Sequence, residues 1–230
     1  MKKMKFSVVL LSALIILSGC GMNNTTKGGL LGAGGGAALG ALAGKLIGGS
    51  GKSTAIGAAI GTAVGTTAGV LIGKKMDKAK AEAAAIANAQ VESVTDANGL
   101  QAVKVTFDSG ILFATNKAEL NSSAKASLKE FADVLKNYTD ADVAIVGHTD
   151  NTGSDAINNP LSLKRAQSVE SYLKSCGVTA DQITSVDGKG SKEPVADNGT
   201  AAGRTQNRRV EVFMYASQEM IDAANAGTLK

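Results

Sequence analysis

Residues 91–215 of this 230-residue chain are predicted to form a domain of the α+β class, in which helices pack on one mixed β-sheet. Two segments have apolar residues at helical spacing, at 124–135 and 163–173. About 125 residues are enough to bury a single hydrophobic core. Strands are predicted from β-rich or apolar segments at 91–95, 101–107, 143–146, 183–190 and 208–215.

The first two strands are predicted to form a hairpin. Residues 96–99 read Asp-Ala-Asn-Gly and separate the strands 91–95 and 101–107. Asp, Asn and Gly favour tight turns because they hydrogen-bond locally or accept a positive φ. The segment 143–146 is apolar on both faces, which indicates a central strand of the sheet.

The first helix is predicted to begin after Asn121, whose side chain can cap free backbone N–H groups. Pro160 indicates that the second helix begins or bends near that residue. Each helix buries one stripe of side chains, formed by Ala124, Leu128, Phe131 and Leu135 in the first and by Leu163, Ala166, Val169 and Leu173 in the second.

Residues 1–19 are predicted to be a lipoprotein signal peptide, with lysines at positions 2, 3 and 5 before an apolar stretch at 6–17. The sequence Leu-Ser-Gly-Cys at 17–20 resembles a bacterial lipobox. This resemblance implies cleavage before Cys20 and attachment of several acyl chains there, which together anchor a protein stably. Gly21 follows Cys20 at the position where retention in the inner membrane would favour Asp, so the outer membrane is the expected location. Residues 20–27 would then form the lipidated N-terminus and a short linker.

The charge of the chain does not indicate a nucleic-acid partner. Cleavage would remove three lysines and no acidic residue, so the formal net charge of +4 would fall to +1. Aromatic residues make up 3% of the chain, which leaves few side chains for stacking on bases.

Residues 28–75 are predicted to be a glycine-zipper helical hairpin associated with the membrane, with its turn at 48–51. Glycines recur every four residues, which places them on one helix face where two backbones can approach closely. Residues 53–73 carry no charge and reach the length needed to span a bilayer. Self-association through this region is one alternative, and a flexible linker is another. An Ala-rich helical spacer at 76–90 would lead into the domain, and 216–230 would form a short helix and tail.

Four separated motifs occur in one order within the predicted domain. They are Phe-Ala-Thr-Asn-Lys-Ala-Glu-Leu at 113–120, Gly-His-Thr-Asp-Asn-Thr-Gly at 147–153, Asn-Pro-Leu-Ser-Leu-Lys-Arg-Ala at 159–166 and Asn-Arg-Arg-Val-Glu at 207–211. Together they resemble the OmpA-like peptidoglycan-binding domain. The resemblance implies an OmpA-like mixed sheet packed with helices, and non-covalent binding of diaminopimelate in the peptide stems of the cell wall.

Asp150 and Arg165 are the main binding residues that this resemblance implies. Asp150 would pair with the ammonium of diaminopimelate and Arg165 with its carboxylate. Leu161, Arg165 and Ser168 lie on a helix face rotated away from the core stripe, so Arg165 can point toward the loop of Asp150. An internal salt bridge between Asp150 and Arg165 is the alternative interpretation.

Four further residues complete the predicted site. Asn116 would reach the same ligand, and Thr149 and Leu161 would form walls of the pocket. Arg208 or Arg209 would close it, and Arg208 is our choice. Strand alternation would send these two arginines to opposite faces.

The sequence therefore predicts an outer-membrane lipoprotein that binds peptidoglycan and tethers the membrane to the wall. An envelope assembly component, in which the zipper oligomerises and wall binding only positions it, is the alternative. We expect no catalytic residue, cofactor or metal site. His148 is the single histidine, and neither a metal-ligand spacing nor a nucleophile elbow is visible.

Overall fold

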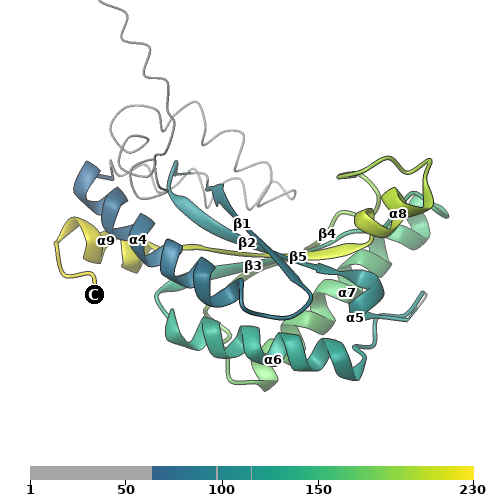
Figure 1. Ribbon diagram of the computed structural model, residues 1–230, viewed down its shortest axis with the longest axis horizontal. Helices are drawn as coiled ribbons and strands as arrows, with labels where there is room; N and C mark the ends of the chain where they lie inside the picture. The colour runs from purple at the N-terminus through teal and green to yellow at the C-terminus, as the bar shows by residue number, and fades with distance from the viewer. Residues whose placement is uncertain (1–63, 97, 115) are drawn as a thin grey trace, which may run out of the picture.

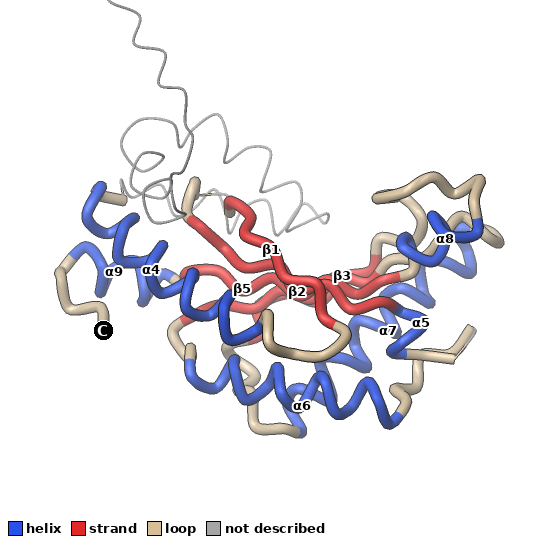
Figure 2. The backbone as a smooth tube through the Cα atoms, in the orientation of Figure 1, coloured by secondary structure: helices blue, strands red, loops and turns tan. Residues whose placement is uncertain are grey.

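The computed structural model describes residues 64–96, 98–114 and 116–230. Within these residues, five strands form one mixed sheet in the order β1-β2-β5-β3-β4 (Figures 1 and 2). Only the β3–β4 pair among them is parallel. The α+β prediction is confirmed. The elements are α4 (Thr66–Ala83), β1 (Ala89–Thr95), β2 (Gln101–Asp108), α5 (Ser109–Leu112), α6 (Ser122–Asn137), β3 (Ala141–Gly147), α7 (Asp155–Ser175), β4 (Ile183–Gly188), α8 (Ala201–Asn207), β5 (Arg209–Ala216) and α9 (Gln218–Asn225).

The hairpin between β1 and β2 is confirmed. The Asp96 carboxylate accepts hydrogen bonds from the backbone N–H groups of Asn98 and Leu100, each at 2.8 Å. Gly99 has a φ of 74°, which glycine adopts without steric cost. β1 begins at Ala89, two residues before the predicted start.

The main core lies between the sheet and helices α6 and α7, which lie beneath the sheet in Figure 1. The cap of α6 is confirmed, because the Asn121 side chain accepts from the Ala124 N–H at 2.8 Å. Phe107 of β2 meets Phe131 of α6 edge to face, with ring centroids 5.8 Å apart. Ala144 and Val146 of β3 join Phe213 in a small cluster on the opposite face, so the central strand is apolar on both faces as predicted.

The second long helix begins earlier than Pro160 indicates. α7 starts at Asp155, after Gly153 with a φ of 90° and Ser154 in an extended conformation. Pro160 therefore lies inside the helix rather than at its start. A proline near the beginning of a helix removes one backbone donor but does not prevent the helix from starting before it.

α4 runs across the boundary at 75/76 that we predicted between the zipper and the spacer. It packs against β2, β1, α6 and α9, so residues 66–73 belong to the described fold. Figure 2 shows α4 and α9 side by side at one end of the sheet. Among the described helices, none combines the length and the hydropathy needed to cross a membrane. Cys20 and the zipper residues 28–63 lie outside the described residues.

Candidate functional site

A pocket of about 710 Å³ lies where β3 ends, between α5, the first half of α7 and α8. It brings together every ligand-binding residue predicted from the sequence, although they come from separate segments of the chain. Its lining is Ser109, Gly110, Phe113, Ala114, Asn116, Thr149, Asp150, Thr152, Asn158, Leu161, Arg165, Arg204 and Arg208.

Two glycines allow α7 to approach the sheet at this pocket. Gly147 and Gly188 are paired neighbours on β3 and β4. A Cβ atom on Gly147 would lie 2.1 Å from the Ser162 carbonyl oxygen, and one on Gly188 would lie 2.4 Å from the Leu163 nitrogen. The helix backbone therefore rests directly on the strand backbones, which places Arg165 near the end of β3.

Asp150 is 7% exposed and is held by two groups. Its carboxylate accepts hydrogen bonds from the Thr152 N–H at 2.8 Å and from Nη1 of Arg208 at 2.7 Å. Burial acts to raise the pKa of the Asp150 carboxyl, but the hydrogen bonds from Arg208 and Thr152 outweigh burial and hold it below its ordinary value. Asp150 is thus a fixed anion in the pocket.

Arg165 is 4% exposed and forms no ion pair with a carboxylate of the described residues. Its Nε donates to the Lys117 carbonyl oxygen at 3.1 Å, and its guanidinium lies 5.2 Å from the centre of the Phe113 ring. Burial lowers the pKa of Arg165, and the nearby Arg208 lowers it further, while Asp150 opposes this change. A buried cation of this kind is normally paired with an anion.

The alternative of an internal Asp150–Arg165 salt bridge is wrong, because Asp150 pairs with Arg208 instead. The reason is geometric: Arg208 lies at the end of α8, faces Asp150 and also donates to Thr205 at 2.8 Å. Arg209 points the other way, so one arginine of the pair lines the pocket, as predicted. The reason is not strand alternation, because Arg208 caps α8 and β5 begins only at Arg209.

A second charged cluster lies on the other side of the sheet from the core. Arg209 donates to Glu211 at 2.7 Å, and Nε2 of His148 lies 3.4 Å from the same carboxylate. The His148 contact is not counted as a hydrogen bond, because neither ring nitrogen has a hydrogen-bond partner within the described structure. Burial acts to raise the pKa of Glu211, but His148 and Arg209 outweigh burial and lower the pKa from 4.5 to about 2.

We expect this cluster to make folding sensitive to acid. A carboxyl whose pKa is lower in the folded state stabilises the fold above its unfolded pKa of 4.5 and loses that contribution as the pH falls toward 2. The loss is about 3 kcal/mol. The difference in unfolding free energy between wild type and Glu211→Gln should therefore be large at pH 6 and shrink steadily below pH 4.5. Urea unfolding across this range measures it, and a difference that does not change with pH would contradict the assignment.

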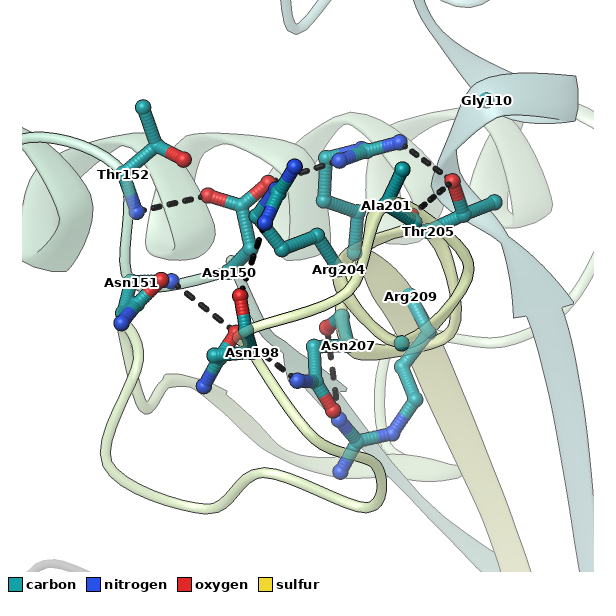
Figure 3. A network of polar contacts seen from close by, with 12 residues as sticks. Gly110, Asp150, Asn151, Thr152, Asn198, Ala201, Arg204, Thr205, Asn207 and Arg209 are labelled. Carbon is teal, nitrogen blue, oxygen red and sulfur yellow. Dashed lines mark hydrogen bonds and ion pairs between the residues drawn. The ribbon is translucent and has the colours of Figure 1, made fainter.

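Arg204 and Asn207 were missed by the sequence analysis, because the path of the loop before α8 is not visible in the sequence. Asn207 is fully buried and fixes this loop through the N–H groups of Val195 and Ala196, at 2.8 and 3.0 Å. Its Nδ2 donates to the Asn198 side chain at 2.8 Å, and Arg204 donates to the Asn198 carbonyl oxygen at 2.9 Å (Figure 3). The motif Asn-Arg-Arg thus holds a structural asparagine beside a pocket arginine.

The arrangement suits binding of a charged polar ligand. It offers one fixed carboxylate, three guanidinium groups and an aromatic wall. No group of three or more His, Cys, Asp or Glu with the geometry of a metal site occurs in the part of the chain that the structure describes.

Comparison with known families agrees with the fold and the motifs. Residues 112–208 match the model of the OmpA family, and residues 1–77 match the YMGG-like Gly-zipper family. The OmpA-family match thus covers most of the described domain, as the motifs predict, and the Gly-zipper match ends within α4.

Individual relatives share this domain. The chain is 47% identical over 104 residues to the peptidoglycan-binding protein ArfA of Mycobacterium tuberculosis, covering 45% of this chain and 32% of ArfA. It is 42% identical over 110 residues to the probable lipoprotein YiaD of Escherichia coli, covering 48% of this chain and 47% of YiaD. The chain thus spans less than half the length of either relative. The cell wall anchor of the T6SS from Pseudomonas aeruginosa superposes with a TM-score of 0.52 at 29% identity, covering 62% of this chain and 97% of that one.

Proposed function

We propose that this chain is an outer-membrane lipoprotein that binds peptidoglycan without a covalent bond and so tethers the outer membrane to the cell wall. Asp150 would bind the ammonium of diaminopimelate and Arg165 its carboxylate, with Asn116, Thr149 and Leu161 as further contacts. The pocket would bind its ligand and catalyse no reaction.

The observation that carries this proposal is the buried positive charge of Arg165. It is a nearly fully buried guanidinium that lines a pocket and has no carboxylate partner among the described residues. A carboxylate bound beside it would offset the cost of burying the charge. Asp150 in the same pocket supplies the opposite charge, and a zwitterionic amino-acid end carries both partners.

Arg208 has a defined part in this proposal. Its side chain is 35% exposed and now occupies one oxygen of Asp150. An incoming ammonium would share or replace that contact, which releases the Arg208 guanidinium toward the ligand. Arg208 would then close the pocket over the bound stem.

The relatives support the same function. ArfA is named as a peptidoglycan-binding protein, YiaD as a lipoprotein, and the structural neighbour as a cell wall anchor. Anchoring through lipidated Cys20 is proposed from the lipobox. Peptidoglycan and outer-membrane lipid are therefore the proposed partners.

Co-sedimentation with insoluble diaminopimelate-type peptidoglycan tests the pocket. The full chain in detergent is expected to pellet with the wall, whereas Asp150→Asn and Arg165→Gln should bind about 10- to 100-fold more weakly, since hydrogen bonds to charged groups contribute about 1.5–3 kcal/mol. Lys164→Gln is the matched control, because it removes an exposed charge next to Arg165 that does not line the pocket. Circular dichroism confirms that each variant folds.

Two outcomes would overturn the assignment. Wild-type protein that stays in the supernatant would refute wall binding, and variants that pellet like wild type would place the site elsewhere. The lipid anchor is tested by metabolic labelling of cells with a radioactive fatty acid, which should label the wild-type chain and leave Cys20→Ala unlabelled. A wild-type chain that carries no label would refute the lipid anchor.

A further inference from the structure

The charges of the pocket exceed what one zwitterion can balance. Three arginines line it, and Asp150 is the one acidic side chain among the described residues of its lining. A diaminopimelate end would bring one ammonium and one carboxylate, which leaves the net charge of the pocket unchanged. Positive charge therefore remains after that end has bound, and a ligand with a further anionic group would balance it better.

Arg204 is placed to bind such a group. It is half-buried on α8, lines the pocket with Arg165 and Arg208, and has no ion pair with a carboxylate of the described residues. Its guanidinium is directed by one hydrogen bond to the Asn198 carbonyl oxygen. Figure 3 shows Arg204 beside Asp150, with Asn198 and Asn207 supporting it.

The support around Arg204 is rigid, which makes it a binding group rather than a mobile surface charge. The Asn198 side chain accepts from Asn207, which is fully buried, and from the Asn151 N–H at 3.3 Å. Asn151 directly follows Asp150, so one hydrogen-bond chain links the loop under Arg204 to the residue that would bind the ammonium. A guanidinium fixed in this way loses little side-chain freedom when it binds a planar carboxylate.

We propose that Arg204 binds a second free carboxylate of the peptide stem, and that the pocket therefore selects stems whose carboxylates are not amidated. This inference rests on the proposed function. Two carboxylates flank diaminopimelate in a stem, one on the preceding glutamyl residue and one at the carboxyl end. Both lie at the other end of the diaminopimelate side chain from its free ammonium and carboxylate, one peptide bond further on, and both carry the charge and the planar shape that arginine binds.

Calorimetric titration of the full chain in detergent with three soluble tetrapeptide stems tests the proposal. The stems are the unmodified peptide, one with the glutamyl carboxylate amidated and one with the terminal carboxylate amidated. Wild type is expected to bind the unmodified stem about 10-fold more tightly than one of the amidated stems, since a charge-assisted hydrogen bond is lost. The weaker stem identifies the carboxylate that Arg204 contacts.

Arg204→Gln should bring that ratio to about 1, because the glutamine keeps a donor for Asn198 but has no charge for the ligand. Arg204→Lys keeps the charge and should retain part of the preference. Lys192→Gln, an exposed charge outside the pocket lining, should keep the full ratio.

The role of Arg204 and the binding of the stem can fail separately. Equal binding of all three stems by wild type, or an unchanged ratio in Arg204→Gln, would overturn the role of Arg204 while wall binding stands. Failure of wild type to bind any stem would overturn both proposals.

Discussion

Gly147→Ala is expected to lower the free energy of unfolding by about 3 kcal/mol or more, at the upper end of what overpacking usually costs. The added Cβ would lie 2.1 Å from the Ser162 carbonyl oxygen and 2.9 Å from its carbonyl carbon. Both are backbone atoms of α7, so no side-chain rotation can relieve the contact. The helix would have to move away from β3 by more than an ångström, and the buried side chains between them would lose contacts.

The same substitution should weaken ligand binding in the protein that remains folded. Asp150 follows Gly147 by three residues, and Arg165 follows Ser162 by three. Any displacement of α7 from β3 therefore increases the separation of the two predicted binding residues. Urea unfolding measures the stability and co-sedimentation with peptidoglycan measures the binding.

Gly65→Ala is the matched control for Gly147→Ala. Gly65 has a φ of −60°, and an added Cβ would meet nothing closer than an Asn225 oxygen at 3.9 Å. Because Gly65 is the N-cap of α4, where alanine is less favourable than glycine, we expect a loss of no more than about 1 kcal/mol there. A Gly147→Ala variant as stable as this control would show that α7 does not rest on the strand backbones.

The local parts of the fold were predictable because their signals lie within a few residues. Asn121 caps its helix, and Asp96 and Gly99 form the hairpin turn, since each acts through neighbouring backbone groups. The buried stripe of α6 follows from helical spacing in the same way. Pro160 suggested too late a start for α7, because a proline in the first turns of a helix does not prevent the helix from beginning before it.

The candidate site was predictable in composition but not in its contacts. Asp150, Arg165 and Asn116 were found through motifs that resemble a family, and the structure places them in one pocket. The pairing of Asp150 with Arg208 was not predictable, since it depends on where α8 ends relative to β3. Gly147 directly follows the predicted strand 143–146 in the sequence, but its main effect is the approach of α7, which only the tertiary structure shows.

The extent of the domain could not be predicted, because α4 carries a pattern that two different environments share. Its glycines are spaced for close helix packing, and a face that packs in a membrane can equally pack on a sheet. In the structure Ala68, Ile72, Met76 and Ala79 are buried on that face, with β2 and α9 among the elements that α4 contacts. The polar side supports this arrangement, since Lys75 pairs with Asp140 at 2.6 Å.

Ile72→Ala and Met76→Ala are each expected to destabilise the fold by about 2–5 kcal/mol, because each removes a fully buried side chain and leaves a cavity. The double variant should lose more than either single variant, since both residues lie on the same face of α4. Denaturant unfolding of the full chain in detergent, followed by circular dichroism, measures these changes.

Lys78→Ala on the exposed side of the same helix is the control, and its stability should stay within about 0.5 kcal/mol of wild type. The comparison decides where the domain begins. If Ile72→Ala and Met76→Ala lower the stability and Lys78→Ala does not, α4 is part of the same folded domain as the sheet. If none of these substitutions lowers the stability, the domain folds without α4, and the helix belongs with the glycine-rich region that precedes it.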